Sequence, residues 1–155
     1  MNKTFRGLLA DGEAQLIRLS TNNGLTGYKI VKFELMPAAP GTADAEHIAK
    51  IFTKKQLDLA GDPATVTGTL DFTNPTLVAA ALTGNSTNIT QNISQSIIFD
   101  NITFNQDIEV THSDVSGSNS VNYLLELEQV KLSKDEATVA TLKDMRAGPD
   151  TNFGS

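Results

Sequence analysis

The sequence predicts a mainly β protein: a single-domain antiparallel β-sandwich, jelly-roll-like, with a short C-terminal amphipathic helix. Three observations predict this fold class. Thr, Asn and Ser are abundant through the first 130 residues, and they favour strands joined by turns. Seven or more strand-like segments follow one another at roughly hairpin spacing, which is typical of sandwiches and jelly rolls. A chain of 155 residues also has the length of about one domain.

The first two strands are expected at residues 14–20 and 28–36, on either side of Asn22-Asn23-Gly24. Asn-Gly tolerates the positive φ angles of a tight turn, so the pattern predicts a β-hairpin. Within the second strand, alternation separates an apolar face from a charged face: Val31, Phe33 and Leu35 against Lys32 and Glu34.

The middle of the chain alternates loops and strands. Residues 37–44 hold two prolines and a glycine and are predicted to form a surface loop. Alternation predicts strands at 48–52 and 66–72. Residues 74–84 fit either a helix, with Asn74-Pro75 at its start and Gly84 at its end, or a buried strand. The Asn/Ser/Thr-rich stretch 85–96 is expected to be an exposed loop.

The later strands are expected at 96–100, 105–111 and 121–130, with a loop at 116–119. In the last strand the apolar residues fall on one face: Val121, Tyr123, Leu125 and Leu127.

A helix is predicted next, because Ser133 and Glu136 form a capping box. Apolar residues follow at helical spacing up to Arg146, and Gly148-Pro149 ends the run: Ala137, Val139, Ala140, Leu142 and Met145. We therefore expect a sandwich domain over 1–132, a helix over 133–147 packed on the sandwich or on a neighbour, and a flexible tail over 148–155.

Composition excludes several classes of function. Twelve basic and 18 acidic residues give a net charge of −6, which disfavours nucleic acid as a partner. The absence of cysteine excludes disulfides, thiol catalysis and cysteine zinc sites. No apolar run is long enough for a membrane span, and residues 1–11 lack the apolar core of a signal peptide. We expect synthesis in the cytoplasm and no membrane partner.

Candidate chemical groups are few. His47 and His112 lie far apart and share no metal-binding motif, so ordinary structural roles are favoured. Glu126 and Glu128 project from one face of a strand, as a glycosidase pair would, but a solvated face is favoured because the chain has no Trp and only two Tyr. Nucleotide-binding and nucleophile motifs are absent. Four formal glycosylation sequons begin at Asn85, Asn88, Asn92 and Asn101, and no glycans are expected. We predict no catalytic residue, no cofactor and no metal site.

Three stretches resemble small β-rich structural proteins of tailed bacteriophages, especially marine ones: Leu25–Phe33, Ser96–Asn101, and Asn122–Glu128 through Thr138–Arg146. The resemblance implies a virion component located on the capsid surface, a capsid decoration or cement protein. It implies the major capsid protein as partner and, from the threefold positions of such proteins, a homotrimer. It carries over no catalytic residues.

An interaction role also follows from the polar loops, the appended helix and the termini. The interface is expected at Val139, Leu142, Met145 and Phe153. The alternative is a head-fibre or tail-associated adhesin that binds a glycan or receptor, and an enzyme is the third reading.

Overall fold

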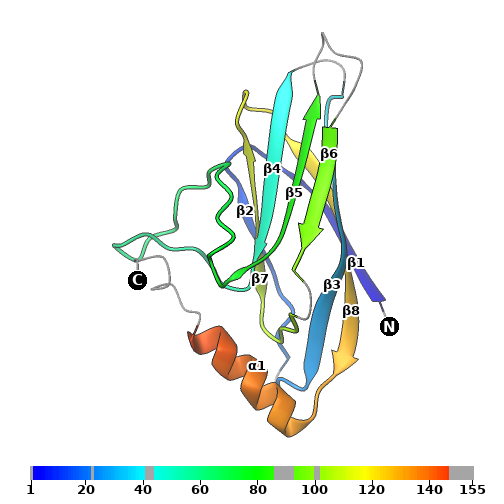
Figure 1. Cartoon of the computed structure of the whole chain (residues 1–155), viewed down its shortest axis with the longest axis vertical. Coiled ribbons are helices and arrows are strands. Elements are labelled where there is room, and N and C mark those ends of the chain that lie inside the picture. Colours follow the sequence, from blue (N-terminus) through cyan, green and yellow to red (C-terminus); the bar gives the residue numbers. More distant parts are fainter. Residues whose placement is uncertain (1, 22, 41–43, 86–92, 100–101, 147–155) are drawn as a thin grey trace.

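Eight antiparallel strands and one helix make up the computed structural model, which describes residues 2–21, 23–40, 44–85, 93–99 and 102–146 (Figure 1). The strands pair into a three-stranded sheet of order β1-β8-β3 and a five-stranded sheet of order β2-β7-β4-β5-β6. The bounds are β1 Asn2–Leu9, β2 Ala14–Ile17, β3 Thr26–Pro37, β4 Ala45–Phe52, β5 Leu77–Asn85, β6 Ile93–Ile98, β7 Ile108–Asp114, β8 Val121–Lys131 and α1 Lys134–Arg146. The predicted mainly β sandwich with a C-terminal helix is confirmed.

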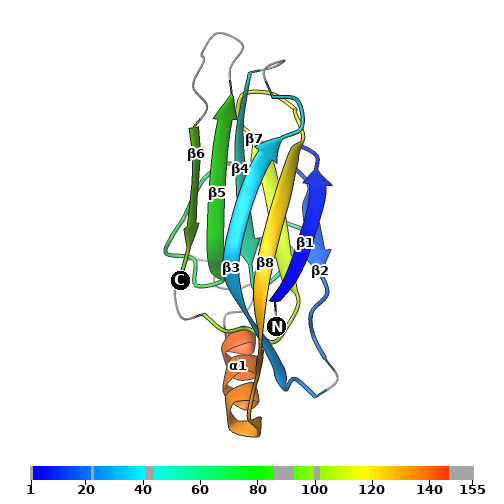
Figure 2. The ribbon, with the colours of Figure 1, turned by 90° about the vertical axis from the view of Figure 1, so that its right-hand side faces the viewer.

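The two sheets lie face to face, and the chain winds repeatedly between them (Figure 2). Each connection from β1 to β4 changes sheets, and so does the connection from β7 to β8. This winding is jelly-roll-like. Strands β4, β5 and β6, which are consecutive in the chain, are neighbours in the larger sheet.

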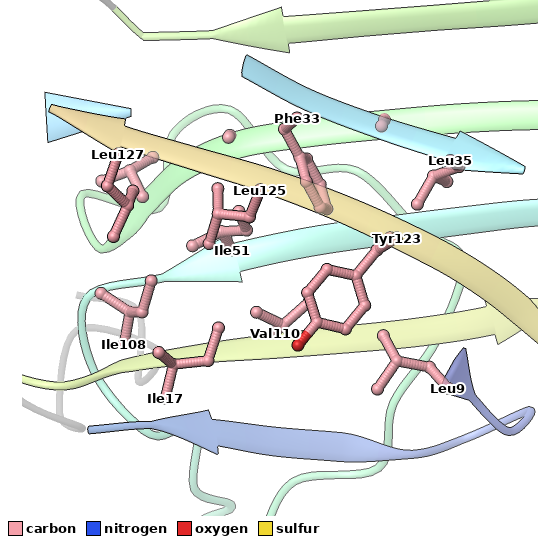
Figure 3. Packing of buried hydrophobic residues seen from close by; sticks show 14 of the residues in the cluster. Leu9, Ile17, Phe33, Leu35, Ile51, Ile108, Val110, Tyr123, Leu125 and Leu127 are labelled. Carbon is pink, nitrogen blue, oxygen red and sulfur yellow. The ribbon is translucent and has the colours of Figure 1, made fainter. Parts of the chain in front are cut away.

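The core fills the space between the sheets (Figure 3). The predicted inner face of β8 is correct, since its four alternating apolar side chains are all buried: Val121, Tyr123, Leu125 and Leu127. They pack against residues of the facing sheet, including Ile51, Ile108 and Val110. Core burial of this kind is the main favourable contribution to folding.

The predicted hairpin around Asn23-Gly24 is wrong. Gly24 does have a positive φ of 67°, but β2 pairs with β7 whereas β3 pairs with β8. After β2, the backbone N–H groups of Leu19 and Ser20 donate to the Asp107 carboxylate, at 2.7 and 2.8 Å. In a hairpin, these backbone N–H groups would donate to the backbone of the neighbouring strand. Here the Asp107 side chain accepts them instead.

One residue of the predicted apolar face of β3 lies on the outside. The register with β8 shifts between Ile30 and Lys32, so Val31 is the extra residue of a β-bulge. Ile30 packs against the core, and Val31 is exposed. Phe33 and Leu35 are buried as predicted.

The strand at 48–52 is confirmed within β4, but the one at 66–72 is wrong. Both edges of β4 are occupied, by β7 and β5, so no edge of this strand is free for residues 66–72. They belong instead to a long connection, residues 53–76, between β4 and β5. Two apolar residues of the predicted strand face, Leu70 and Phe72, are exposed.

The open question at 74–84 is answered by β5. Residues Leu77 to Ala81 are all buried, as expected of a strand covered on both faces. The Asn74 side chain accepts from the Thr76 backbone N–H and hydroxyl, at 2.9 and 2.6 Å, so it forms an Asx turn rather than a helix cap.

The remaining boundaries shift by a few residues. The loop predicted at 85–96 is wrong at both ends, because β5 extends to Asn85 and β6 begins at Ile93; residues 86–92 lie outside the described residues. The loop at 116–119 is confirmed. Pro37, placed in a loop, ends β3. The helix stop at Gly148-Pro149 and the tail over 148–155 lie outside the described residues.

Candidate functional site

The helix that carries the predicted interface is held at one end of the sandwich, beyond the strand ends (Figures 1 and 2). Its capping box forms: the Glu136 backbone N–H donates to the Ser133 hydroxyl at 3.2 Å, and the Ser133 backbone N–H donates to the Glu136 carboxylate at 3.1 Å. These reciprocal bonds satisfy two backbone donors at the helix start.

A buried asparagine attaches the helix to the sandwich. The Asn105 side-chain amide donates to the Gly24 carbonyl and the Thr141 hydroxyl, each at 3.0 Å, and lies 3.4 Å from the Ala137 carbonyl oxygen. Ala137 is buried at this contact. The helix therefore turns small and polar residues toward the sandwich.

Two larger apolar residues of α1, Val139 and Leu142, are partly exposed. Val139 is 51% exposed and Leu142 is 43% exposed. Val139 lines a groove of about 470 Å³ with residues of β3 and β8, and Leu142 lines one of about 440 Å³ beside Leu25. Of the predicted interface, the Met145 side chain and Phe153 lie outside the described residues.

The two histidines, which share no motif, meet between the sheets. β4 and β7 are neighbours, with Ala49 opposite His112 and His47 opposite Asp114. His47 Nδ1 and His112 Nε2 lie 2.9 Å apart, and the exposed fractions of the two side chains are 1% and 0%. Sequence reasoning missed this contact because it requires the pairing of β4 with β7.

The hydrogen bonds assign the protons of this pair. His112 Nδ1 lies 3.0 Å from the Ala10 carbonyl oxygen, which can only accept, so Nδ1 carries the proton and Nε2 accepts from His47 Nδ1–H. His47 Nε2 is then an acceptor, and it is buried without a hydrogen-bond partner among the described residues. Burial is the largest cause that lowers the pKa of His47, and the charge of His112 is the second. The charges of Asp114 and Asp11 oppose the shift. Burial therefore favours the neutral form of His47.

The glutamates considered as a catalytic pair lie on the outer face of the three-stranded sheet. Glu126 stands opposite Lys32, and Glu128 stands opposite Lys29. Glu126 also accepts from the Asn2 side-chain amide at 3.1 Å. Glu128 is exposed. This is a solvated face with alternating charges, as the favoured interpretation has it.

A cavity of about 490 Å³ lies on the outer face of the five-stranded sheet, under the connection 53–76. Figure 1 shows this connection, teal to green, beside β2, β7 and β4. The sheet contributes two charged side chains with small exposed fractions, Lys50 at 8% and Glu109 at 6%. Burial lowers the pKa of Lys50 and raises the pKa of Glu109.

One feature of the sequence indicates this cavity. Lys50 lies between Ile48 and Phe52 on one face of a predicted strand, and a charged residue within an apolar face indicates a covered polar site. The signal was incomplete because 66–72 was predicted to be a strand rather than part of a cover.

The described residues contain neither a candidate metal site nor a candidate membrane span. Within the described ranges, no group of three or more His, Cys, Asp or Glu side chains is placed to hold a metal ion. The same part of the chain contains no helix long and apolar enough to cross a membrane.

Comparisons with known proteins give distant similarities. No protein-family model and no curated protein matches the chain. One solved structure similar to it comes from Bacillus endospore appendages, which form a novel family of disulfide-linked pili, with 9% identity, a TM-score of 0.35, and coverage of 86% of this chain and 88% of that chain. Another is the infectious bursal disease virus VP2 subviral particle, with 12% identity, a TM-score of 0.19, and coverage of 85% and 38%. Both are too distant to carry an argument about function.

Proposed function

We propose that this protein is a structural subunit of a tailed-phage virion, a capsid decoration or cement protein that binds the major capsid protein lattice on the capsid surface. The resemblance in the sequence motivates the proposal. The observation that carries it is the half-exposed pair Val139 and Leu142 on α1. The helix lies at the end of the sandwich, where its start is capped and Asn105 bonds to it, so these side chains are presented beyond the strand ends.

The proposed action is mechanical. Apolar side chains that leave water on binding stabilise the contact by about 25 cal/mol for each Å² buried, and two such residues with their flanking grooves make only part of an interface. A standard interface of about 1,600 Å² spans a wide range of affinities. Many lattice sites acting together then raise the cost of separating neighbouring capsomers. This action requires no catalysis and no cofactor.

We also infer that the protein acts as a homotrimer, which suits a threefold position on a shell. Light scattering of the full chain is expected to give three times the mass of 16.6 kDa. A monomer at every concentration, together with monomers on the particle, would exclude the trimer.

The docking surface is tested by the double variant Val139→Ser, Leu142→Ser, added to shells stripped of the protein. We expect at least about tenfold weaker binding, because the apolar contact is lost, with an unchanged far-UV spectrum. The matched control is the double variant Leu8→Ser, Val31→Ser, which removes exposed apolar residues of the three-stranded sheet and should bind normally.

Two results would contradict the proposal. One is normal binding by the α1 variant. The other is an absence of binding to shells by the unmodified protein combined with binding to host cells, the behaviour of an adhesin.

A further inference from the structure

The cavity under residues 53–76 is built around a charged and a polar side chain that are neighbours across two strands. Lys50 of β4 lies directly opposite Thr111 of β7 in the register. Both side chains leave the sheet on its outer face, opposite to the core residues Ile51 and Val110. Both line the cavity and are more than nine-tenths buried, with exposed fractions of 8% for Lys50 and 3% for Thr111.

Thr111 has unused hydrogen-bonding capacity. Its hydroxyl oxygen is buried and has no hydrogen-bond partner among the described residues. Buried polar atoms in folded proteins are nearly always hydrogen-bonded, so each exception asks for an explanation. Thr111 lines the cavity, and a ligand that reached its hydroxyl there would complete its hydrogen bonds.

Lys50 lacks a negative partner. Its ammonium donates to the Thr69 carbonyl at 2.8 Å and lies 5.8 Å from the centre of the Phe52 ring. An ammonium has three donors, and no carboxylate of the described residues lies within ion-pair distance of it. Burial lowers its pKa, and a bound anion would offset this cost.

The carboxylates of the cavity are already partnered. Glu109 accepts from the Gln56 backbone N–H at 3.2 Å, and Lys55 acts on its charge. Asp71 accepts from the Thr73 backbone N–H and side chain. Of the two buried charged groups, Glu109 has an opposite charge acting on it, from Lys55, whereas burial alone shifts the pKa of Lys50.

The rest of the lining is largely apolar and includes Leu16, Phe52, Leu57 and Val66. One ammonium and one hydroxyl can donate to the two oxygens of a carboxylate, whereas they would leave the further oxygens of a phosphate without donors. A volume of about 490 Å³ is within the range of small-molecule sites. We propose that this cavity binds a small organic monocarboxylate, with its carboxylate on Lys50 and Thr111 and its apolar body against Leu16, Phe52 and Leu57.

The test is a titration of the full-length protein with sodium octanoate, followed by methyl NMR. We expect saturable shifts at Leu16 and Leu57 but not at Leu127 of the core. Octylammonium chloride has the same chain and the opposite charge, so it should bind at least about tenfold more weakly.

Variants separate this site from general adsorption. Thr111→Val removes the unpartnered hydroxyl at nearly constant shape, so the fold should be retained, and octanoate should bind more weakly. Lys50→Met should reduce affinity by about tenfold or more. The control Lys32→Met changes an exposed lysine of the other sheet and should leave affinity unchanged.

The proposal is overturned if octanoate gives no saturable shift, if octylammonium binds equally well, or if Thr111→Val binds octanoate as the unmodified chain does. Should Lys50→Met fail to fold, Thr111→Val still decides the matter. None of these outcomes depends on the docking of α1 to a shell.

Discussion

At the scale of single residues, we expect buried His47 to make stability depend on pH. The pKa of His47 is lowered below its ordinary value of 6.5 in the folded protein, so the unfolded chain binds this proton more readily. The stabilising contribution is complete above pH 6.5 and is lost as pH falls below it. From about pH 7.5 to about pH 5.5 we expect unfolding free energy to drop by about 1 kcal/mol, measured by denaturant titration.

The matched variant is His47→Asn, whose side-chain amide N–H takes the place of His47 Nδ1–H facing His112 Nε2 but does not titrate. Its stability should fall less over the same range. Burial raises the pKa of Glu109, so this residue makes the unfolding free energy rise as pH falls. The effect is the same in both proteins and cancels when their pH dependences are compared. Equal pH dependence in the two proteins would remove His47 as the cause.

Contacts between residues far apart in the chain could not be predicted from the sequence pattern. His47 and His112 are separated by 65 positions, and only the β4–β7 pairing brings their rings together. The Asp107 carboxylate likewise binds the backbone of Leu19 and Ser20, which no local pattern signals. The face of β8 was predictable because alternation alone places Tyr123 and Leu125 together.

At the scale of elements, Asn105 supplies hydrogen bonds that attach α1 to the sandwich. Asn105 is buried and donates to both sides of the contact, at Gly24 and Thr141. Asn105→Ala leaves these acceptors without their donor, and we expect a loss of about 1–3 kcal/mol. Hydrogen exchange should become faster in α1 and remain slow in β8.

The control for this prediction is Asn122→Ala, which shortens an exposed asparagine on the outer face of β8. It should leave the exchange of α1 unchanged. Slow exchange in the α1 of the Asn105→Ala protein would show that other contacts hold the helix.

Elements with strong local signals were predictable. The capping box of Ser133 and Glu136 predicts where α1 begins, because its bonds join residues three positions apart. The stretch 66–72 has an equally clear alternation, but β5 and β7 already occupy the edges of β4. Which segments pair with β4 depends on all the segments that could pair with it. The pattern and composition of residues 66–72 alone therefore cannot show that this stretch stays unpaired.

At the scale of the whole molecule, the sandwich is a rigid support with two separate candidate surfaces. The proposed docking surface lies at the α1 end, around Val139 and Leu142. The proposed ligand cavity lies on the outer face of the five-stranded sheet, around Lys50 and Thr111. The docking surface could be predicted from the sequence, because the spacing of apolar residues along a helix involves only neighbouring positions. The second required the tertiary cover of residues 53–76.

The most direct measurement is cross-linking mass spectrometry on the purified native particle that contains this chain, together with its copy number. The proposed function predicts many copies, with cross-links from Lys134 at the start of α1 to the major capsid protein. A few copies linked only to tail or fibre proteins, or no copies on any particle, would contradict it.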